Sequence, residues 1–229
     1  LHLMCGFLKP SSGNIFIDDR PLSEFRDDEL ASFRLNTLGW LPQDPSTVIF
    51  PNKNVKFNIS FSLKLKGEPA NQINKKVKEI SKSLGIYNIL HYNINSLSGG
   101  ELQRAVLAST LIKNSRLLIL DEPTGELDLQ NSRLTMEVIS DFQDNTGATI
   151  ILTTHDQAII EKSLFKNNFH VVNLRSGSIV SSSLKDLMEK SMKCILTTDG
   201  FLNLPEKILI NQQIEKTPVF LCYHNNALW

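Results

Sequence analysis

The sequence has 229 residues, which is enough for one large domain or for a domain with a small appendage. Hydrophobic residues make up 41% of it, and 24 Lys and Arg residues balance 24 Asp and Glu residues. This composition is typical of a globular protein and argues against a general polyanion binder, so no nucleic-acid partner is expected. Because no run of roughly 18 apolar residues is present, we expect any membrane role to come through a partner.

The N-terminal part predicts several short elements around one strand. The chain begins with an apolar stretch, residues 1–8, that has no capping residue ahead of it, as in a helix that has already started. A turn at 9–13, a short strand at 14–19 and an amphipathic helix over 22–33 are expected next. The segment LGWLPQ at 38–43 then predicts a strand that closes on a glutamine.

The middle of the chain, from residue 51 to residue 96, predicts helices. Apolar residues within 73–84 recur at i, i+4, i+7 and i+11, which indicates an amphipathic helix, and Gly85 follows as a helix terminator. We therefore expect a helical subdomain at about 51–112.

The next part alternates between helices and buried strands. A glycine pair in LSGGE, at 97–101, opens a helix, and RLLIL at 116–120 and ATIILTTH at 148–155 read as continuously apolar strands. The helix between these strands has one apolar face, which is made of Leu134, Val138 and Phe142. Strands that alternate with helices predict an α/β fold with a parallel sheet and flanking helices.

The C-terminal part predicts further strands. HVVNLRSGSIV at 170–180 reads as an antiparallel pair that turns at Ser176-Gly177. We expect a domain over 1–180, followed at 181–229 by a linker and a small C-terminal β extension. In that extension a hairpin is expected at 195–204, with which LCYH at 221–224 could pair.

Two carboxylates follow the strand at 116–120. Asp121 and Glu122 are expected at the carboxyl edge of a parallel sheet, which is where open α/β folds bind ligands. An Asp there can hold Mg²⁺, and an adjacent Glu can orient or deprotonate a water that attacks a γ-phosphate. Acidic residues also end many solvated strands, so the pair alone leaves both interpretations open.

Three other features are equally ambiguous alone. The N–H groups at the start of the helix after LSGGE, with the hydroxyl of Ser98, suit an anion, although a glycine pair is usually only a turn. His155 ends the strand at 148–155 and could contact a γ-phosphate and the attacking water, or be structural. Gln43 could be a ligand of Mg²⁺ or water, or an ordinary loop residue.

The order and spacing of these features are specific. The glutamine precedes Ser98 by 55 positions, Ser98 precedes Asp121 by 23, and His155 follows Glu122 by 33. Over residues 1–180 this combination resembles the nucleotide-binding domain of ABC-type ATPases. The resemblance makes LSGGE at 97–101 the signature motif and TGELD at 124–128 the D-loop. Within the family, the segment DEPTGELD at 121–128 looks closest to the ATP-binding subunits of the lipoprotein-release and macrolide-export group.

The resemblance implies an ATPase of P-loop type that powers a transporter from the cytoplasmic face of the membrane, with ATP and Mg²⁺ as cofactors. It implies transmembrane permease subunits and a second ATP-binding domain as partners, in a homodimer or pseudo-dimer. It assigns catalysis to Glu122 and His155, and metal binding to Asp121 and Gln43. It assigns nucleotide contacts, some of them across the dimer, to Gln43, Ser98, Gly99, Gly100, Glu101 and Asp128.

The sequence departs from the family pattern in two places. Relatives usually carry a second arginine where this chain has Ser109, which we interpret as a tuning change in a helix. The family's phosphate-binding loop, Walker A, is expected immediately before residue 1 and is missing from this sequence. From this we expect the chain as given to bind ATP poorly and to hydrolyse it negligibly.

Alternative functions follow from the same observations. The chain could be a degenerate or truncated, non-catalytic ABC cassette that acts as an interaction module, although intact Glu122, His155 and Gln43 argue against decay. It could also be a soluble ABC ATPase outside transport. The DNA-maintenance members of that class carry long coiled coils between the glutamine and the signature motif, and no sustained heptads appear here.

Overall fold

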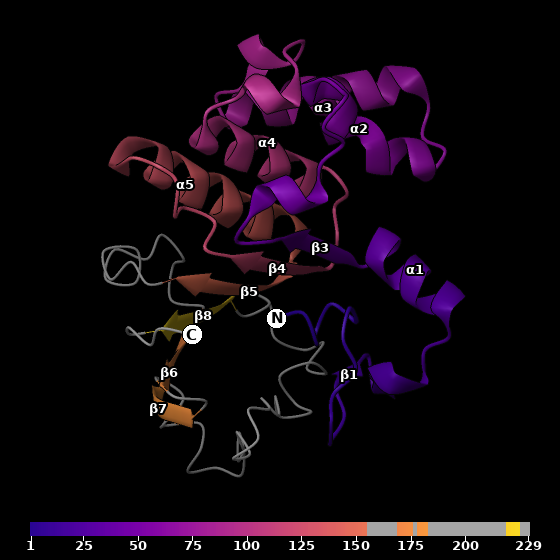
Figure 1. Ribbon diagram of the computed structural model, residues 1–229, viewed down its shortest axis with the longest axis vertical. Coiled ribbons are helices and arrows are strands. Elements are labelled where there is room, and N and C mark those ends of the chain that lie inside the picture. Colours follow the sequence, from indigo (N-terminus) through magenta and orange to yellow (C-terminus); the bar gives the residue numbers. More distant parts are fainter. Residues whose placement is uncertain (155–168, 176–177, 183–218, 225–229) are drawn as a thin grey trace.

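The computed structural model describes residues 1–154, 169–175, 178–182 and 219–224, and its centre is a six-stranded sheet (Figure 1). The strand order is β3-β4-β5-β8-β6-β7, and only the pairing of β6 with β7 is antiparallel. The strands of this sheet are β3 (Leu38–Leu41), β4 (Leu117–Asp121), β5 (Thr149–Thr154), β6 (Phe169–Arg175), β7 (Ser178–Ser182) and β8 (Val219–His224).

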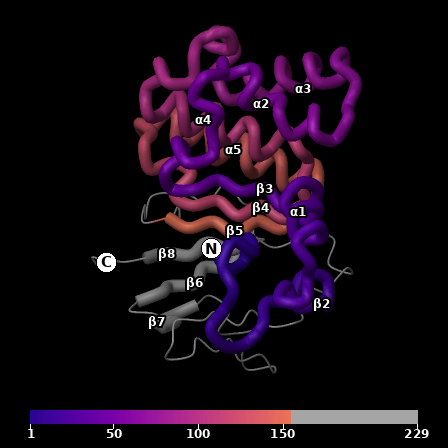
Figure 2. Tube along the Cα trace, turned by 45° about the vertical axis from the view of Figure 1, so that its right-hand side comes forward, coloured from indigo at the N-terminus to yellow at the C-terminus, as the bar shows by residue number. Residues whose placement is uncertain are grey.

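Helices cover one face of the sheet, and a short hairpin with its following helix lies on the other side (Figures 1 and 2). In chain order the α-helices are α1 (Asp27–Asn36), α2 (Val55–Leu65), α3 (Ala70–Ser83), α4 (Gly99–Leu111) and α5 (Leu129–Thr146), and α1 is the helix that follows the hairpin. The hairpin consists of β1 (Phe16–Ile17) and β2 (Arg20–Pro21). The expected α/β class, with a parallel sheet and flanking helices, is confirmed.

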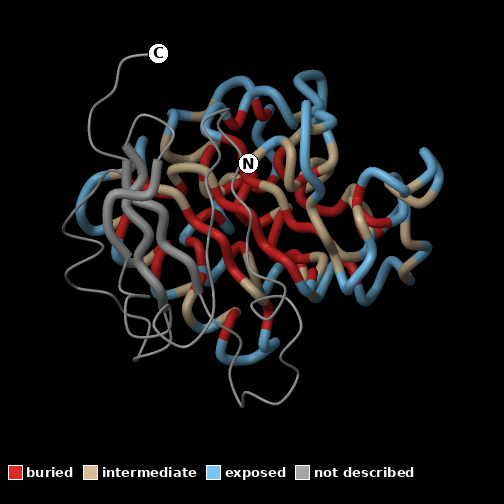
Figure 3. Tube along the Cα trace, turned by 90° about the horizontal axis from the view of Figure 1, so that it is seen from below, coloured by how far each residue is buried: buried red, intermediate tan, exposed pale blue. Residues whose placement is uncertain are grey.

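Strand β4 has the apolar run that a central parallel strand needs, and its side chains divide between two cores. Leu118 and Leu120 are fully buried in the larger core, which they share with α2, α3, α4 and α5. Leu117 and Ile119 belong to a smaller core on the opposite face, with residues from the N-terminal segment and α1. Because both faces are covered, the strand is apolar without alternation, and red buried backbone runs through the centre of the molecule in Figure 3.

The amphipathic helix that the periodicity predicts within 73–84 forms as part of α3. In α3, Ile73 and Val77 are buried in the larger core, and the helix ends before Gly85, whose φ of +68° suits glycine. The Asn54 side chain caps α2 by accepting a hydrogen bond from the Phe57 N–H at 2.8 Å. The outer limits of the subdomain and the division of the chain at residue 180 stay predictions.

Helix α5 packs through a face slightly different from the expected one. Val138 and Phe142 are only partly buried at the margin of the larger core. The fully buried line is made of Ser132, Thr135, Met136, Ile139 and Gln143. Because polar residues make up much of this buried face, the pattern of apolar residues predicted the neighbouring face instead.

Residues 1–8 do not extend into a regular helix. A single turn is closed by the hydrogen bonds from Cys5 N to Leu1 O at 3.1 Å and from Phe7 N to His2 O at 3.0 Å. Gly6 then takes the left-handed conformation with φ of +67°, which ends the turn. Burial raises the pKa of the Cys5 thiol to about 12, so this thiol is expected to be chemically inert.

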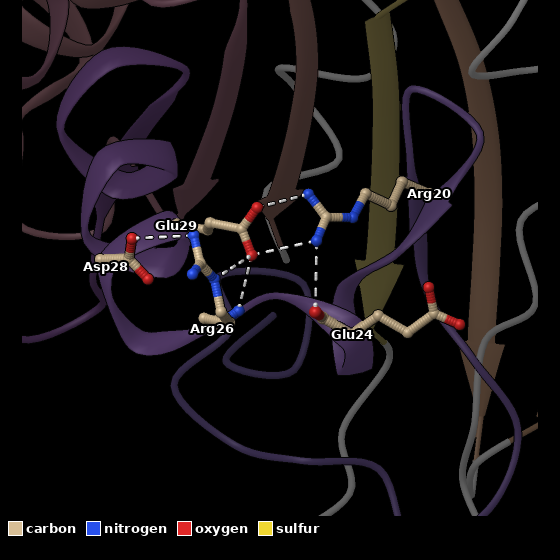
Figure 4. A network of polar contacts seen from close by, with 5 residues as sticks. All are labelled: Arg20, Glu24, Arg26, Asp28 and Glu29. Carbon is tan, nitrogen blue, oxygen red and sulfur yellow. Dashed lines mark hydrogen bonds and ion pairs between the residues drawn. The ribbon is translucent and has the colours of Figure 1, made fainter.

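Charged side chains fasten the hairpin to α1 (Figure 4). The Arg20 guanidinium donates to both Glu29 carboxylate oxygens, at 2.7 and 3.0 Å, and to the Glu24 carbonyl at 3.3 Å. The Arg26 N–H donates to Glu29 Oε2 at 2.9 Å at the start of the helix. The hydrogen bond from Arg20, with that from Arg26, lowers the pKa of Glu29 to about 2. Glu29 is therefore ionised at neutral pH.

The C-terminal strands differ from expectation at one place. The antiparallel pair within 170–180 is confirmed as β6 and β7, while its turn and the expected hairpin at 195–204 lie outside the described residues. The strand at 221–224 forms as β8, but it pairs in parallel with β5 and β6 in the main sheet. That position satisfies backbone groups on both sides of β8, which a two-stranded pairing with a hairpin would not.

No helix within the described part of the chain is long and apolar enough to cross a membrane.

The contact between α4 and β3 depends on Gly39. A Cβ atom there would overlap Leu118 Cδ2 and lie 3.1 Å from Thr110 Cγ2, inside a packed core. We predict that Gly39→Ala lowers the free energy of unfolding by about 1–3 kcal/mol, measured by urea denaturation. Gly125→Ala is the matched control, because its Cβ would meet nothing closer than 3.5 Å. Equal effects of the two substitutions would contradict this packing.

Candidate functional site

The sequence-predicted residues of β3 and β4 meet at one edge of the sheet. Leu41 pairs with Leu120 in the parallel register, and Asp121 pairs with Thr153 of β5. Gln43, two positions after Leu41, is therefore level with the residue after Asp121, at the carboxyl ends of adjacent strands (Figure 1). Gln43 is exposed, so its amide is available to a ligand at this edge.

Asp121 is held by the neighbouring strand. The Thr153 hydroxyl donates to Asp121 Oδ1 at 2.6 Å, which fixes the orientation of a half-buried carboxylate. The Glu122 N–H donates to the Thr153 carbonyl at 3.1 Å and approaches the Thr153 hydroxyl at 3.3 Å. One threonine thus contacts both acidic residues.

The Glu122 backbone is unusual. Its φ of +47° lies in the left-handed region, which residues other than glycine seldom occupy. Its carbonyl accepts two hydrogen bonds, from Gly125 N at 3.1 Å and from Gln103 Nε2 at 2.7 Å. Gln103 also accepts a hydrogen bond from the Glu126 N–H, at 3.1 Å. The turn after β4 is therefore tied to α4.

The signature segment LSGGE forms the start of α4. Ser98 is the N-cap, with Glu101 Oε2 accepting from its N–H at 2.9 Å and from its hydroxyl at 2.8 Å. These hydrogen bonds from Ser98 lower the pKa of Glu101, so its carboxylate is ionised at neutral pH. Glu101 therefore holds the cap of α4, and its contact with a nucleotide stays a prediction.

The two glycines of the signature segment lie against the loop that follows β4. A Cβ on Gly99 would come 3.0 Å from Glu126 Oε2, and one on Gly100 would come 3.0 Å from Leu127 Cδ2 and 3.2 Å from the Glu126 carbonyl. The segment TGELD, predicted to be the D-loop, and the signature glycines are thus neighbours within one chain. Only small residues allow this approach.

Asp128 has a structural role in the described structure. It is the N-cap of α5, with its Oδ1 accepting from Asn131 N at 2.9 Å and its Oδ2 from Asn131 Nδ2 at 2.7 Å. These hydrogen bonds from Asn131 lower the pKa of Asp128. A contact of Asp128 across a dimer stays a prediction.

The remaining predicted site residue, His155, lies outside the described residues. In the sequence it directly follows Thr154, the last residue of β5. Within the described residues, no group of three or more His, Cys, Asp or Glu side chains could hold a metal ion by itself. Mg²⁺ is often bound through one or two carboxylates together with substrate phosphates, and Asp121 with Gln43 offers oxygen ligands of that type.

Sequence reasoning missed two polar residues of this site. Thr153 is the fifth residue of β5, and an apolar strand that ends in Thr-Thr was a usable signal. Gln103 is only 1% exposed, although it lies just after the first turn of a helix whose other buried residues are mostly apolar. A polar residue at a buried helical position is the signal for such a contact.

Comparisons with known proteins show the family of this chain. The family model described as ABC transporter matches residues 1–125, which is more than half of the chain. The chain therefore belongs to the ABC transporter family, as an ATP-binding domain. The Bacillus subtilis ABC transporter ATP-binding protein YtrE is 32% identical over 180 residues, which is 79% of this chain and 77% of YtrE. The lipoprotein-releasing system ATP-binding protein LolD of Blochmanniella floridana is 32% identical over 162 residues, covering 71% of this chain and 68% of LolD.

A solved structure shows the same fold. The dimeric ATP-binding cassette MJ0796, bound to ADP and Pi, matches with a TM-score of 0.71 and 22% identity, over 80% of this chain and 77% of that chain. Some relatives are longer, and the ABC domain spans at most 61% of the molybdate/tungstate import proteins that it matches.

Thr153 offers a test of how Asp121 is held. We predict that Thr153→Val in the full-length protein raises the Mg²⁺ concentration for half-maximal nucleotide binding by about 10-fold, because the carboxylate loses its orienting hydroxyl. Thr153→Ser keeps the hydroxyl and is the control. Titration of Mg²⁺ at constant nucleotide measures the effect. An unchanged Mg²⁺ requirement in the valine variant would show that Asp121 is positioned without Thr153.

Proposed function

We propose that this ABC domain binds and hydrolyses ATP and that hydrolysis drives a transporter through membrane partners. The observation that carries the proposal is the meeting of Asp121, Glu122 and Gln43 at one sheet edge, with the signature helix tied to the same turn. Family membership supports ATP binding. We propose a place at the cytoplasmic face of the membrane, reached through transmembrane permease subunits.

Glu122 is the proposed general base. It immediately follows the carboxylate that Thr153 orients, and its backbone is held in a fixed conformation by hydrogen bonds on both sides. A carboxylate in such a place can accept a proton from water as the water attacks. His155, at the end of β5, is proposed to contact the γ-phosphate and the same water.

Asp121 and Gln43 are proposed as oxygen ligands of Mg²⁺. When bound, ATP would supply the phosphoanhydride bond to be broken, and Mg²⁺ would neutralise the negative charge that develops on the phosphate oxygens. This chain orients the two metal-binding side chains. Thr153 holds the Asp121 carboxylate, and Gln43 follows the end of the adjacent strand β3. These residue types fit the donor set that Mg²⁺ prefers.

The signature segment is proposed to bind the nucleotide of a second ATP-binding domain. Ser98 and the first N–H groups of α4 form a helix N-terminus, which favours an anion. The dimeric state of MJ0796 supports a head-to-tail pair of this fold. In such a pair, Ser98, Gly99, Gly100 and Glu101 would close over ATP held by the partner, with Asp128 at the interface.

Two alternatives remain to be separated by experiment. A non-catalytic cassette would keep the fold without turnover, and a soluble ABC ATPase would hydrolyse ATP without membrane partners. The left-handed backbone at Glu122, next to the carboxylate that Thr153 orients, favours a functional role for this turn. Relatives named for molybdate/tungstate import and for lipoprotein release match at similar identity, 35% and 32%, so no cargo is proposed.

Replacing Glu122 tests the proposed function directly. We predict that Glu122→Gln in the full-length protein lowers ATP turnover by about 10²–10⁴-fold and leaves nucleotide binding and dimerisation intact, because only the proton acceptor is lost. Steady-state phosphate release and calorimetric nucleotide titration measure the two effects. Near-normal turnover would remove Glu122 from the role of base.

A mixed dimer tests whether the signature acts across the dimer. In a dimer of one Ser98→Arg chain with one Glu122→Gln chain, a composite arrangement collects both lesions in one site and leaves the other site whole. We predict turnover clearly above that of the homodimer that carries both substitutions in each chain. If the mixed dimer binds ATP and closes yet hydrolyses no faster than that homodimer, the composite site is wrong.

A further inference from the structure

Gln103 connects the two halves of the proposed site within one chain. It lies in α4, the helix whose first residues are the signature glycines, and its side chain is 1% exposed. Its Nε2 donates to the Glu122 carbonyl at 2.7 Å, and its Oε1 accepts from the Glu126 N–H at 3.1 Å. The amide therefore spans the turn from the general base to the predicted D-loop.

The chemistry of this bridge requires an amide. One partner is a carbonyl, which only accepts, and the other is an N–H, which only donates. Glutamine supplies a donor and an acceptor at the same side-chain end, whereas an ionised glutamate has no donor and leucine has neither. The two partners also determine which end of the amide faces which, because the reverse orientation would satisfy neither.

The conformation at Glu122 explains why such a bridge matters. A non-glycine residue at φ of +47° is strained and keeps that conformation only when its surroundings hold it. The Glu122 N–H is held by Thr153 of β5, and its carbonyl is held by Gln103 from α4 and by Gly125 within the turn. Gln103 is the contact that ties this peptide group to the signature helix.

We propose that Gln103 is a positioning residue, which holds the Glu122 backbone and the Glu126 amide so that the base and the predicted D-loop keep a constant relation to the signature helix. This inference rests on the proposed role of Glu122 as general base. When the signature segment moves on binding a partner's nucleotide, the Gln103 side chain would pass this movement to Glu122, the general base of the same chain.

The test uses the full-length protein with Gln103→Leu, which removes both hydrogen bonds, and Gln103→Glu at a pH high enough to ionise the new carboxyl, which then keeps an acceptor for Glu126 but has no donor for the Glu122 carbonyl. We expect kcat to fall about 10- to 100-fold in both variants, with the nucleotide Kd unchanged, because a displaced base costs rate rather than binding. Amide exchange at Glu126 is expected to accelerate in the leucine variant and to stay slow in the glutamate variant.

The matched control is Val77→Ala, which creates a cavity in α3, within the helical subdomain. It is expected to lower the melting temperature while kcat stays unchanged. If the Gln103 variants lose stability but keep kcat as Val77→Ala does, or if the nucleotide Kd rises as kcat falls, the positioning role is overturned. If Gln103→Leu does not fold, the kcat of Gln103→Glu decides. Normal turnover in Glu122→Gln would instead refute the proposed role of Glu122 as general base, and absent turnover in the unsubstituted protein would refute the proposed function.

Discussion

The parallel register of β3, β4 and β5 determines where every candidate residue of this domain lies. Parallel strands end at the same edge, so the polar residues that follow Leu41 and Leu120, and those that end β5, are brought together without any contact between their own side chains. The register is in turn held by two apolar cores, because shifting β4 by one residue would exchange the side chains that face α4 with those that face the N-terminal segment.

Within that frame, two neutral polar side chains hold the charged ones in place. Thr153 orients the Asp121 carboxylate from the adjacent strand, and Gln103 binds the Glu122 peptide group from the helix above. Both side chains are neutral, so they hold these groups in place without changing the net charge at the sheet edge. Signature segment, acidic pair and predicted D-loop thereby form one connected unit within a single chain.

Much of this arrangement could be predicted from the sequence, for physical reasons. A strand buried on both faces must be continuously apolar, so β4 and β5 could be recognised in the sequence, and the glycine pair in LSGGE marked the start of α4. The place of β8 between β5 and β6 could not be predicted, because strand pairing across long sequence distances leaves no local pattern. Gln103 was missed because a lone polar residue in a helix shows its partner only when the fold is known.

The most direct test of this account is to locate bound metal and nucleotide on the full-length protein. Mn²⁺ with a non-hydrolysable ATP analogue broadens the NMR signals of nearby residues, and the account predicts the strongest broadening around Gln43, Asp121 and Thr153. In a dimer that is isotopically labelled in one chain and lacks metal binding in that chain, broadening should move to the segment 98–101. Broadening centred away from the carboxyl edge of β3, β4 and β5 would contradict the account.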